Sequence, residues 1–158
     1  MEILNRIEKI VKLFSQKNIQ IAVAESCTGG YVSNMITNIS GASAIFERGI
    51  ICYSNKAKIE LLDINPDSLE EHGAVSDVIV KQLANNIRIK SKVNIGIGIS
   101  GIAGPTGGSP EKPVGLVYIG FSTETGITIE KYIFKTDRIN FKQKVLEKVI
   151  QYLESINI

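Results

Sequence analysis

Cysteine and histidine are scarce in this chain of 158 residues, which contains two cysteines and one histidine. So few cysteines in a chain of this length argue against a disulfide framework. Cys27, Cys52 and His72 are also too few for a zinc site built from cysteine and histidine alone. We therefore expect no metal site and no cofactor.

An excess of charge of one sign is absent as well, because 18 basic and 16 acidic residues leave a net charge of +2. These charges are spread along the chain without a basic block, so nucleic acid binding has little support.

An uninterrupted membrane-spanning segment is also missing. Ser26–Phe46 and Val93–Pro110 are uncharged and long enough to cross a bilayer, but Gly, Ser, Asn or Pro residues interrupt both. The N-terminal region carries several charged residues and does not resemble a signal peptide. We therefore expect a cytoplasmic protein with no membrane partner.

Hydrophobic spacing predicts a single α/β domain over residues 1–158, with elements in the order α-β-α-β-α-α-α-β-β-β-α. Strands are expected at Ile19–Glu25, Gly49–Tyr53, Val93–Ile99, Val114–Thr123 and Ile127–Lys135. The early β-α units imply parallel pairing, and a hairpin turn at Glu124–Gly126 adds antiparallel pairing. The sheet should therefore be mixed, mostly parallel, and covered by helices on both faces.

A small-residue turn, Ser26-Cys27-Thr28-Gly29-Gly30, joins the first strand to a predicted helix. Such a turn leaves backbone N–H groups pointing outward, where they can meet an anion or a developing oxyanion. It also places Ser26 or Cys27 at the end of a strand, where open α/β sheets bind ligands. A plain strand-to-helix turn with two helpful glycines is the competing interpretation.

Glycines are concentrated late in the chain, with half of the 14 between Gly96 and Gly115. Gly96–Gly101 has the spacing of a dinucleotide-binding fingerprint, but its first glycines lie inside a predicted strand, so a close backbone neighbour explains them better. The irregular loop Gly101–Pro113 that follows is typical of a binding loop, since its glycines allow backbone N–H groups to approach a phosphate and Lys112 adds charge. A flexible surface loop is the alternative.

A base for a serine nucleophile is most readily supplied by lysine, because His72 lies in a short helix where a surface or capping role is expected. Lys58 follows the second strand and Tyr53, and would reach the same sheet edge as Ser26. A free lysine is neutral in only about one molecule in a thousand at pH 7.5, so burial must lower its pKa. Tyr53 could relay or steady the proton; otherwise Lys58 is a solvated helix residue.

Five stretches, in order, resemble the CinA C-terminal domain family, the nicotinamide-nucleotide amidohydrolases. They are Ala24–Gly30, Phe46–Gly49, Tyr53–Lys58, Gly73–Ser76 and Ser100–Pro105. The resemblance implies a three-layer α/β/α fold, a homodimer, and hydrolysis of nicotinamide mononucleotide (NMN) to nicotinate mononucleotide and ammonia in pyridine-nucleotide recycling. Many relatives carry an extra N-terminal domain that is not part of this sequence.

The resemblance also assigns roles to residues. It makes Ser26 the nucleophile, with Tyr53 and Lys58 as its catalytic partners, and Cys27 is then expected to pack inward. Substrate contacts are expected from Cys27, Thr28, Gly29, Gly30, Arg48, Ser100, Gly101, Gly104, Gly107, Gly108 and Lys112. Near the C-terminus, Thr136 replaces a family glycine and Lys142 stands in place of an arginine, so contacts there are open. A non-catalytic nucleotide-binding or regulatory module is the alternative function, although a mere binder has no need of Ser26, Tyr53 and Lys58 together.

Overall fold

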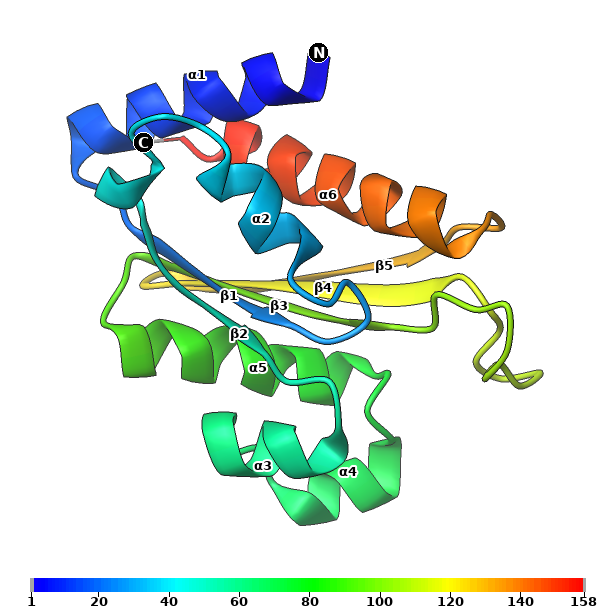
Figure 1. The fold of residues 1–158 in the computed structure, drawn as a ribbon. Helices are drawn as coiled ribbons and strands as arrows, with labels where there is room; N and C mark the ends of the chain where they lie inside the picture. Colours follow the sequence, from blue (N-terminus) through cyan, green and yellow to red (C-terminus); the bar gives the residue numbers. More distant parts are fainter. Residues whose placement is uncertain (1, 158) are drawn as a thin grey trace.

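The computed structural model describes residues 2–157 as a five-stranded sheet with helices on both faces (Figure 1). The strands are β1 (Ile21–Glu25), β2 (Phe46–Ile51), β3 (Ile95–Gly101), β4 (Leu116–Thr123) and β5 (Gly126–Ile133). The helices are α1 (Glu2–Lys17), α2 (Tyr31–Thr37), α3 (Asn55–Leu62), α4 (Pro66–His72), α5 (Asp77–Ser91) and α6 (Arg138–Ser155), with one 3₁₀ turn, η1 (Ala42–Ala44). The predicted order of helices and strands is confirmed.

The sheet has the strand order β2-β1-β3-β4-β5. β1 pairs in parallel with β2 and β3, whereas the β3–β4 and β4–β5 pairs are antiparallel. The predicted mixed sheet and the β4–β5 hairpin are therefore confirmed. The parallel part is smaller than we expected, because β4 runs back along β3 instead of continuing the parallel series.

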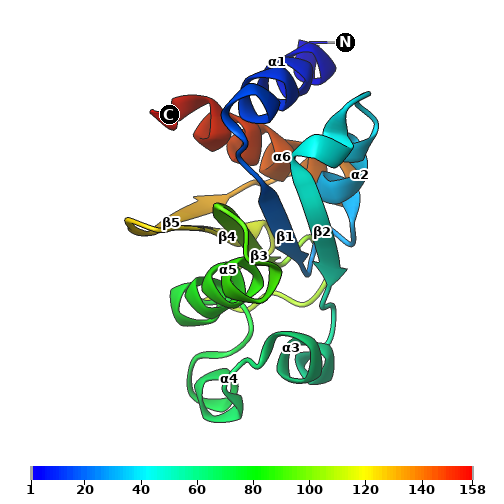
Figure 2. The ribbon, with the colours of Figure 1, turned by 90° about the vertical axis from the view of Figure 1, so that its left-hand side faces the viewer.

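Two hydrophobic cores separate the three layers, with α1, α2 and α6 on one face and α3, α4 and α5 on the other (Figures 1 and 2). Successive side chains of β1 point to opposite faces of the sheet, so this strand contributes to both cores. Ile21 and Val23 pack toward α1 and α6, whereas Ala22 and Ala24 pack toward α5. Within residues 2–157, every helix is too short or too polar to cross a membrane.

The side-chain-free face of β3 lies directly against α5, as the glycine pattern predicted. A Cβ on Gly96 would lie 2.2 Å from the carbonyl oxygen of Ala84, and one on Gly98 would lie 2.6 Å from the Ala84 nitrogen. Only glycine allows the helix backbone to approach the strand this closely. The alternation of glycine and isoleucine in β3 is therefore a packing feature, and no dinucleotide-binding turn is present there.

The second strand differs most from its predicted position, because it begins at Phe46 instead of Gly49 and ends at Ile51 instead of Tyr53. β2 is an edge strand whose side chains are mostly exposed, so charged Glu47 and Arg48 occupy it without disturbing a core. Hydrophobic spacing predicted a strand here but not its bounds, since the pairing with β1 determines where β2 begins and ends.

Candidate active site

The carboxyl ends of the three parallel strands meet at one edge of the sheet, as the sequence predicted. Ser26 follows β1, Tyr53 follows β2, and Ser100 and Gly101 end β3. These residues line an open pocket of about 270 Å³. The rest of its lining comes from Cys27, Asn55, Lys58, Ala74, Val75, Ile102, Ala103, Gly104, Thr106, Gly107 and Arg138.

Lys58 points from α3 into the protein, and its side chain is only 1% exposed. The Ser54 hydroxyl accepts the Ala57 N–H at 3.0 Å and caps the helix start. The Lys58 Nζ lies 3.0 Å from the Ser26 Oγ. It also donates to the backbone carbonyls of Cys52, at 2.9 Å, and Tyr53, at 3.3 Å.

This environment favours the neutral amine. Burial lowers the pKa of Lys58 from its ordinary value of 10.5. A neutral amine has two N–H groups and one lone pair, so donation to the Cys52 and Tyr53 carbonyls directs the lone pair toward the Ser26 hydroxyl. A neutral Lys58 held by the two carbonyls is able to accept the serine proton.

The turn after β1 offers fewer backbone donors to a ligand than predicted. The Gly29 N–H donates to the Ser26 carbonyl at 3.1 Å, and the Gly30 N–H donates to the Glu25 carboxylate at 3.0 Å. The N–H groups of Cys27 and Thr28 donate to no carbonyl or carboxylate within residues 2–157. Of the two, Cys27 lines the pocket, so its N–H is the one available to an oxyanion there, whereas Thr28 is fully buried outside the lining. Gly29 and Gly30 shape the turn with φ angles of 60° and 93°.

Cys27 is buried beside Ser26, with 6% of its surface exposed. Burial, its largest influence, raises the pKa of the thiol to about 12, so almost none of it is thiolate at neutral pH. This is the inward packing that we expected.

Tyr53 contributes to the site differently from the predicted proton relay. Its backbone carbonyl contacts Lys58, while the residue is 61% exposed and lines the pocket. Its hydroxyl makes no hydrogen bond to Lys58 or Ser26. The structure therefore gives no geometry for a phenol relay.

The glycine-rich loop contributes its first half to the pocket. Gly101, Gly104 and Gly107 line it, but Gly108 does not. Ser100 lines it too, although its hydroxyl donates to the Ala74 carbonyl at 2.8 Å. Lys112 is outside the lining as well, because its ammonium donates to the His72 carbonyl at the end of α4. Its predicted contact with substrate is thus replaced by a contact within the protein.

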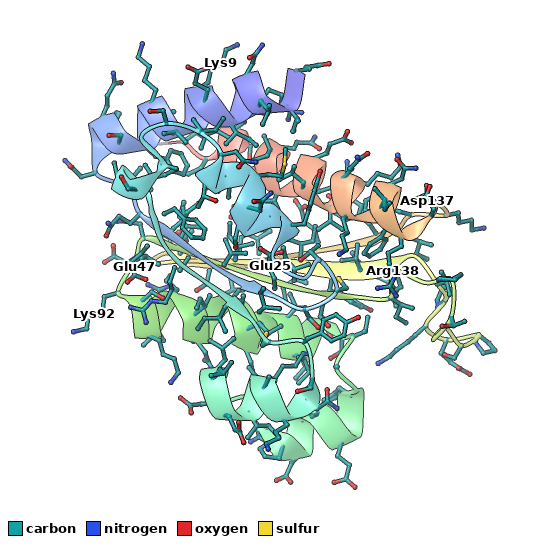
Figure 3. The ribbon with its side chains drawn as sticks, viewed as in Figure 1. Lys9, Glu25, Glu47, Lys92, Asp137 and Arg138 are labelled. Carbon is teal, nitrogen blue, oxygen red and sulfur yellow. The ribbon has the colours of Figure 1, made fainter. Side chains whose placement is uncertain are left out.

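Arg48 lies away from the site. Its guanidinium is paired with Glu47, which lies at the opposite end of the sheet from Arg138 (Figure 3). The Phe46–Gly49 stretch therefore matches the family pattern without supplying a pocket residue. Thr28, Gly29 and Gly30 are likewise absent from the lining and form the turn behind it.

Arg138 is the main pocket residue that we did not predict. It begins α6, where Asp137 accepts the N–H groups of Ile139 and Asn140, and its Nε donates to the Gly104 carbonyl at 2.9 Å. Lys142 lies one helical turn later and close to Gly29: its Nζ is 3.6 Å from the position that a Cβ on Gly29 would occupy. The only sequence signal was the family resemblance near Thr136 and Lys142, since a helix start alone does not indicate a pocket. Asn55, Ala74 and Val75 were also missed as lining residues.

No three His, Cys, Asp or Glu side chains among residues 2–157 are grouped in a way that could hold a metal ion.

Residues 4–156 match the model of the CinA C-terminal domain. A competence-damage inducible protein of Thermoanaerobacter pseudethanolicus is 43% identical over 155 residues, which are 96% of this chain and 38% of the relative. One from Clostridium perfringens is 40% identical over 92% of this chain and 35% of the relative. The chain thus spans little more than a third of these relatives.

Solved structures extend the similarity to the fold. The competence/damage inducible protein CihA from Agrobacterium tumefaciens has a TM-score of 0.94 and 31% identity, covering 98% of this chain and 95% of that one. A CinA superfamily protein from Klebsiella pneumoniae, at 24% identity, has a TM-score of 0.92 over 97% of this chain and 96% of its own, and supports the fold alone. The chain belongs to the CinA C-terminal domain family.

Proposed function

We propose that this domain hydrolyses the carboxamide of NMN, producing nicotinate mononucleotide and ammonia. The observation that carries the proposal is the 3.0 Å contact between the Lys58 Nζ and the Ser26 Oγ, with the lysine 1% exposed. A buried amine directed at a serine hydroxyl at a pocket floor is the arrangement that an acyl-transfer site requires. The identity of the amide comes from the family resemblance.

In the first half of the reaction, the Ser26 Oγ attacks the carboxamide carbon while Lys58 takes the hydroxyl proton. The oxyanion that forms accepts a hydrogen bond from the backbone N–H of Cys27. The C–N bond then breaks as the Lys58 ammonium returns its proton to the leaving nitrogen. Ammonia departs, and the nicotinoyl group remains esterified to Ser26.

In the second half, water attacks the ester carbonyl and Lys58 accepts one of its protons. The C–O bond to Ser26 breaks, and the serine oxygen recovers that proton from Lys58. The acid formed at the carbonyl loses its remaining proton to solvent, nicotinate mononucleotide leaves as a carboxylate, and the free enzyme is regenerated with Lys58 neutral again.

Two further pocket residues suit the rest of the substrate. Arg138 uses only its Nε for the Gly104 carbonyl, so its terminal N–H groups can bind the phosphate. Tyr53 is the only aromatic residue among those lining the pocket. Its exposed ring can lie against the cationic pyridinium, a contact worth about 0.5–2 kcal/mol.

The direct test is ammonia release from NMN by the wild-type protein and by Ser26→Ala. We expect turnover from the wild type only, and Ser26→Ala should still bind NMN. Hydroxylamine added during turnover should yield the hydroxamate, since it competes with water for the ester on Ser26. Binding of NMN without ammonia release by the wild type would refute the amidase and favour a nucleotide-binding regulatory module.

A further inference from the structure

A buried carboxylate lies directly next to the candidate nucleophile. Glu25 ends β1, immediately before Ser26, and is 0% exposed. It forms no ion pair with any residue in the range 2–157. A buried charge without a cationic partner is costly unless hydrogen bonds replace its lost water, so the contacts of this side chain need an explanation.

All of those contacts come from the first turn of α2 (Figure 3 labels Glu25 beside this helix). The Oε2 accepts the N–H groups of Gly30 at 3.0 Å and Val32 at 3.2 Å. The Oε1 accepts the N–H of Ser33 at 2.7 Å and its hydroxyl at 2.6 Å. Two oxygens surrounded by four hydrogen-bond donors are what a carboxylate requires, because a carboxylate accepts hydrogen bonds and donates none.

The carboxylate therefore replaces the usual local cap of a helix. The N-cap residue of α2 is Gly30, which has no side chain to accept these N–H groups. Glu25 reaches forward across the turn instead and ties the end of β1 to the start of α2. The intervening residues, Ser26–Gly29, are held between these two fixed points.

The backbone of Glu25 also supports the lysine side of the site. Its carbonyl accepts the Cys52 N–H at 2.8 Å, and the Cys52 carbonyl in turn accepts from the Lys58 Nζ at 2.9 Å. One residue thus connects the nucleophile turn with the group that orients the base.

We propose that Glu25 is a positioning residue for the Ser26–Lys58 pair. Its carboxylate keeps the turn in the shape that places the Ser26 Oγ 3.0 Å from the Lys58 Nζ. The proposal rests on the proposed function for its choice of substrate. Its effect should be on the rate of attack, not on substrate affinity, because Glu25 itself does not line the pocket.

The test compares Glu25→Gln with Ser33→Ala. The glutamine amide turns one acceptor into a donor that faces backbone N–H groups, whereas Ser33→Ala removes only one of the four contacts and keeps the carboxylate. We expect Glu25→Gln to lower kcat for NMN about 10- to 100-fold with KM changed by less than about 3-fold. Ser33→Ala should stay within about 3-fold of wild type in both. Circular dichroism and thermal unfolding establish the folded fraction, by which each rate is divided.

A second measurement is independent of NMN. Attack of Ser26 on p-nitrophenyl acetate forms the acetyl ester, transfers the serine proton to Lys58 and releases nitrophenolate, and the Ser26→Ala rate is subtracted as background. Glu25→Gln should slow this release by a similar factor. If the wild type fails on NMN but shows Ser26-dependent ester cleavage, the substrate is wrong while Glu25 is still tested.

Glu25→Asp provides the test if Glu25→Gln does not fold, because it keeps the charge but withdraws the carboxylate from α2 by one methylene. It should show the same loss of kcat. Folded Glu25→Gln or Glu25→Asp with wild-type rates on both substrates would overturn the proposal. A loss that disappears after correction for the folded fraction would also overturn it, since the role would then be structural only.

Discussion

At the scale of single residues, the decisive contact is between an amine and a hydroxyl that are both shielded from water. An ammonium at Lys58 would donate to the Ser26 hydroxyl and to two carbonyls, and no carboxylate among residues 2–157 forms an ion pair with it. Burial therefore lowers the pKa of Lys58, which increases the fraction present as the neutral base at physiological pH.

The Lys58→Arg variant tests this role of the neutral amine. Arginine keeps the positive charge but does not lose its proton, so we expect kcat to fall at least about 10³-fold, as for Lys58→Ala. Ammonia release from NMN measures the effect, and circular dichroism checks the fold. A nearly normal rate for Lys58→Arg would mean that Lys58 acts only through its charge.

The pH dependence of the wild type should report the same group. Because the neutral form is active, kcat/KM should rise with pH and level off above the pKa of Lys58. That midpoint should lie below 10.5, the ordinary value for lysine, since burial shifts it downward. A profile that falls with rising pH across this range would exclude Lys58 as the general base.

Cys27 and Ser26 are neighbours with opposite expected roles. Cys27→Ala should keep activity within about 5-fold and lose about 1–2 kcal/mol of stability from the lost buried sulfur, whereas Ser26→Ala should be inactive. Iodoacetamide at pH 8 should modify Cys27 very slowly in the folded protein, because its thiol is buried with a pKa of about 12. Rapid alkylation of Cys27 with complete loss of activity would move the nucleophile to the thiol.

At the scale of elements, the start of α6 closes the pocket from the side opposite α3. Arg138→Gln removes the guanidinium while keeping a polar side chain of similar length. We expect kcat/KM for NMN to fall about 10- to 100-fold, the effect of losing a charge-assisted hydrogen bond. The value for nicotinamide riboside, which has no phosphate, should stay within about 3-fold.

Arg48→Gln is the matched control, because Arg48 is paired with Glu47 and lies outside the pocket. It should leave both substrates unaffected. Equal losses for NMN and the riboside in Arg138→Gln would show that Arg138 supports the loop at Gly104 and does not bind the phosphate.

The contact between α5 and β3 is a second feature at this scale. A Cβ on Gly98 would lie 2.6 Å from the Ala84 nitrogen and 2.9 Å from the Val80 carbonyl oxygen, which belong to the helix backbone. Gly98→Ala should therefore cost about 2 kcal/mol or more of unfolding free energy, measured by urea denaturation. Thr128→Ala, on exposed β5, should change it by less than about 1 kcal/mol. An unfolding free energy equal to that of the wild type for Gly98→Ala would show that α5 can move away from β3 without loss of stability.

At the scale of the whole molecule, the chemistry should depend on the chain alone. Exhaustive dialysis against EDTA should leave ammonia release within about 2-fold of the untreated rate, since a neutral lysine supplies the base and a backbone N–H stabilises the oxyanion. Added zinc or magnesium should not increase it. Loss of activity that a divalent ion restores would require a metal in the mechanism.

The sequence by itself determined the order of the elements and the position of the pocket on the sheet. Helical and strand periods are local properties, and β1, β2 and β3 are each followed by small or polar residues, so the shared carboxyl edge could be predicted. Ser26 was a candidate because it directly follows the first predicted strand, and Lys58 because it lies in the helix that follows the second.

Only the tertiary structure decided which candidates meet. Burial depends on the elements packed around a side chain, so Lys58 could not be distinguished from a solvated lysine until α3 was placed against the sheet. Arg48 and Lys112 were expected at the pocket because of their charge, but Glu47 and the His72 carbonyl hold them elsewhere. Arg138 enters the site across a separation of more than a hundred residues from Ser26, and Glu25 becomes a cap only when α2 folds back over it. Such contacts depend on distance in space, which no local pattern in the sequence records.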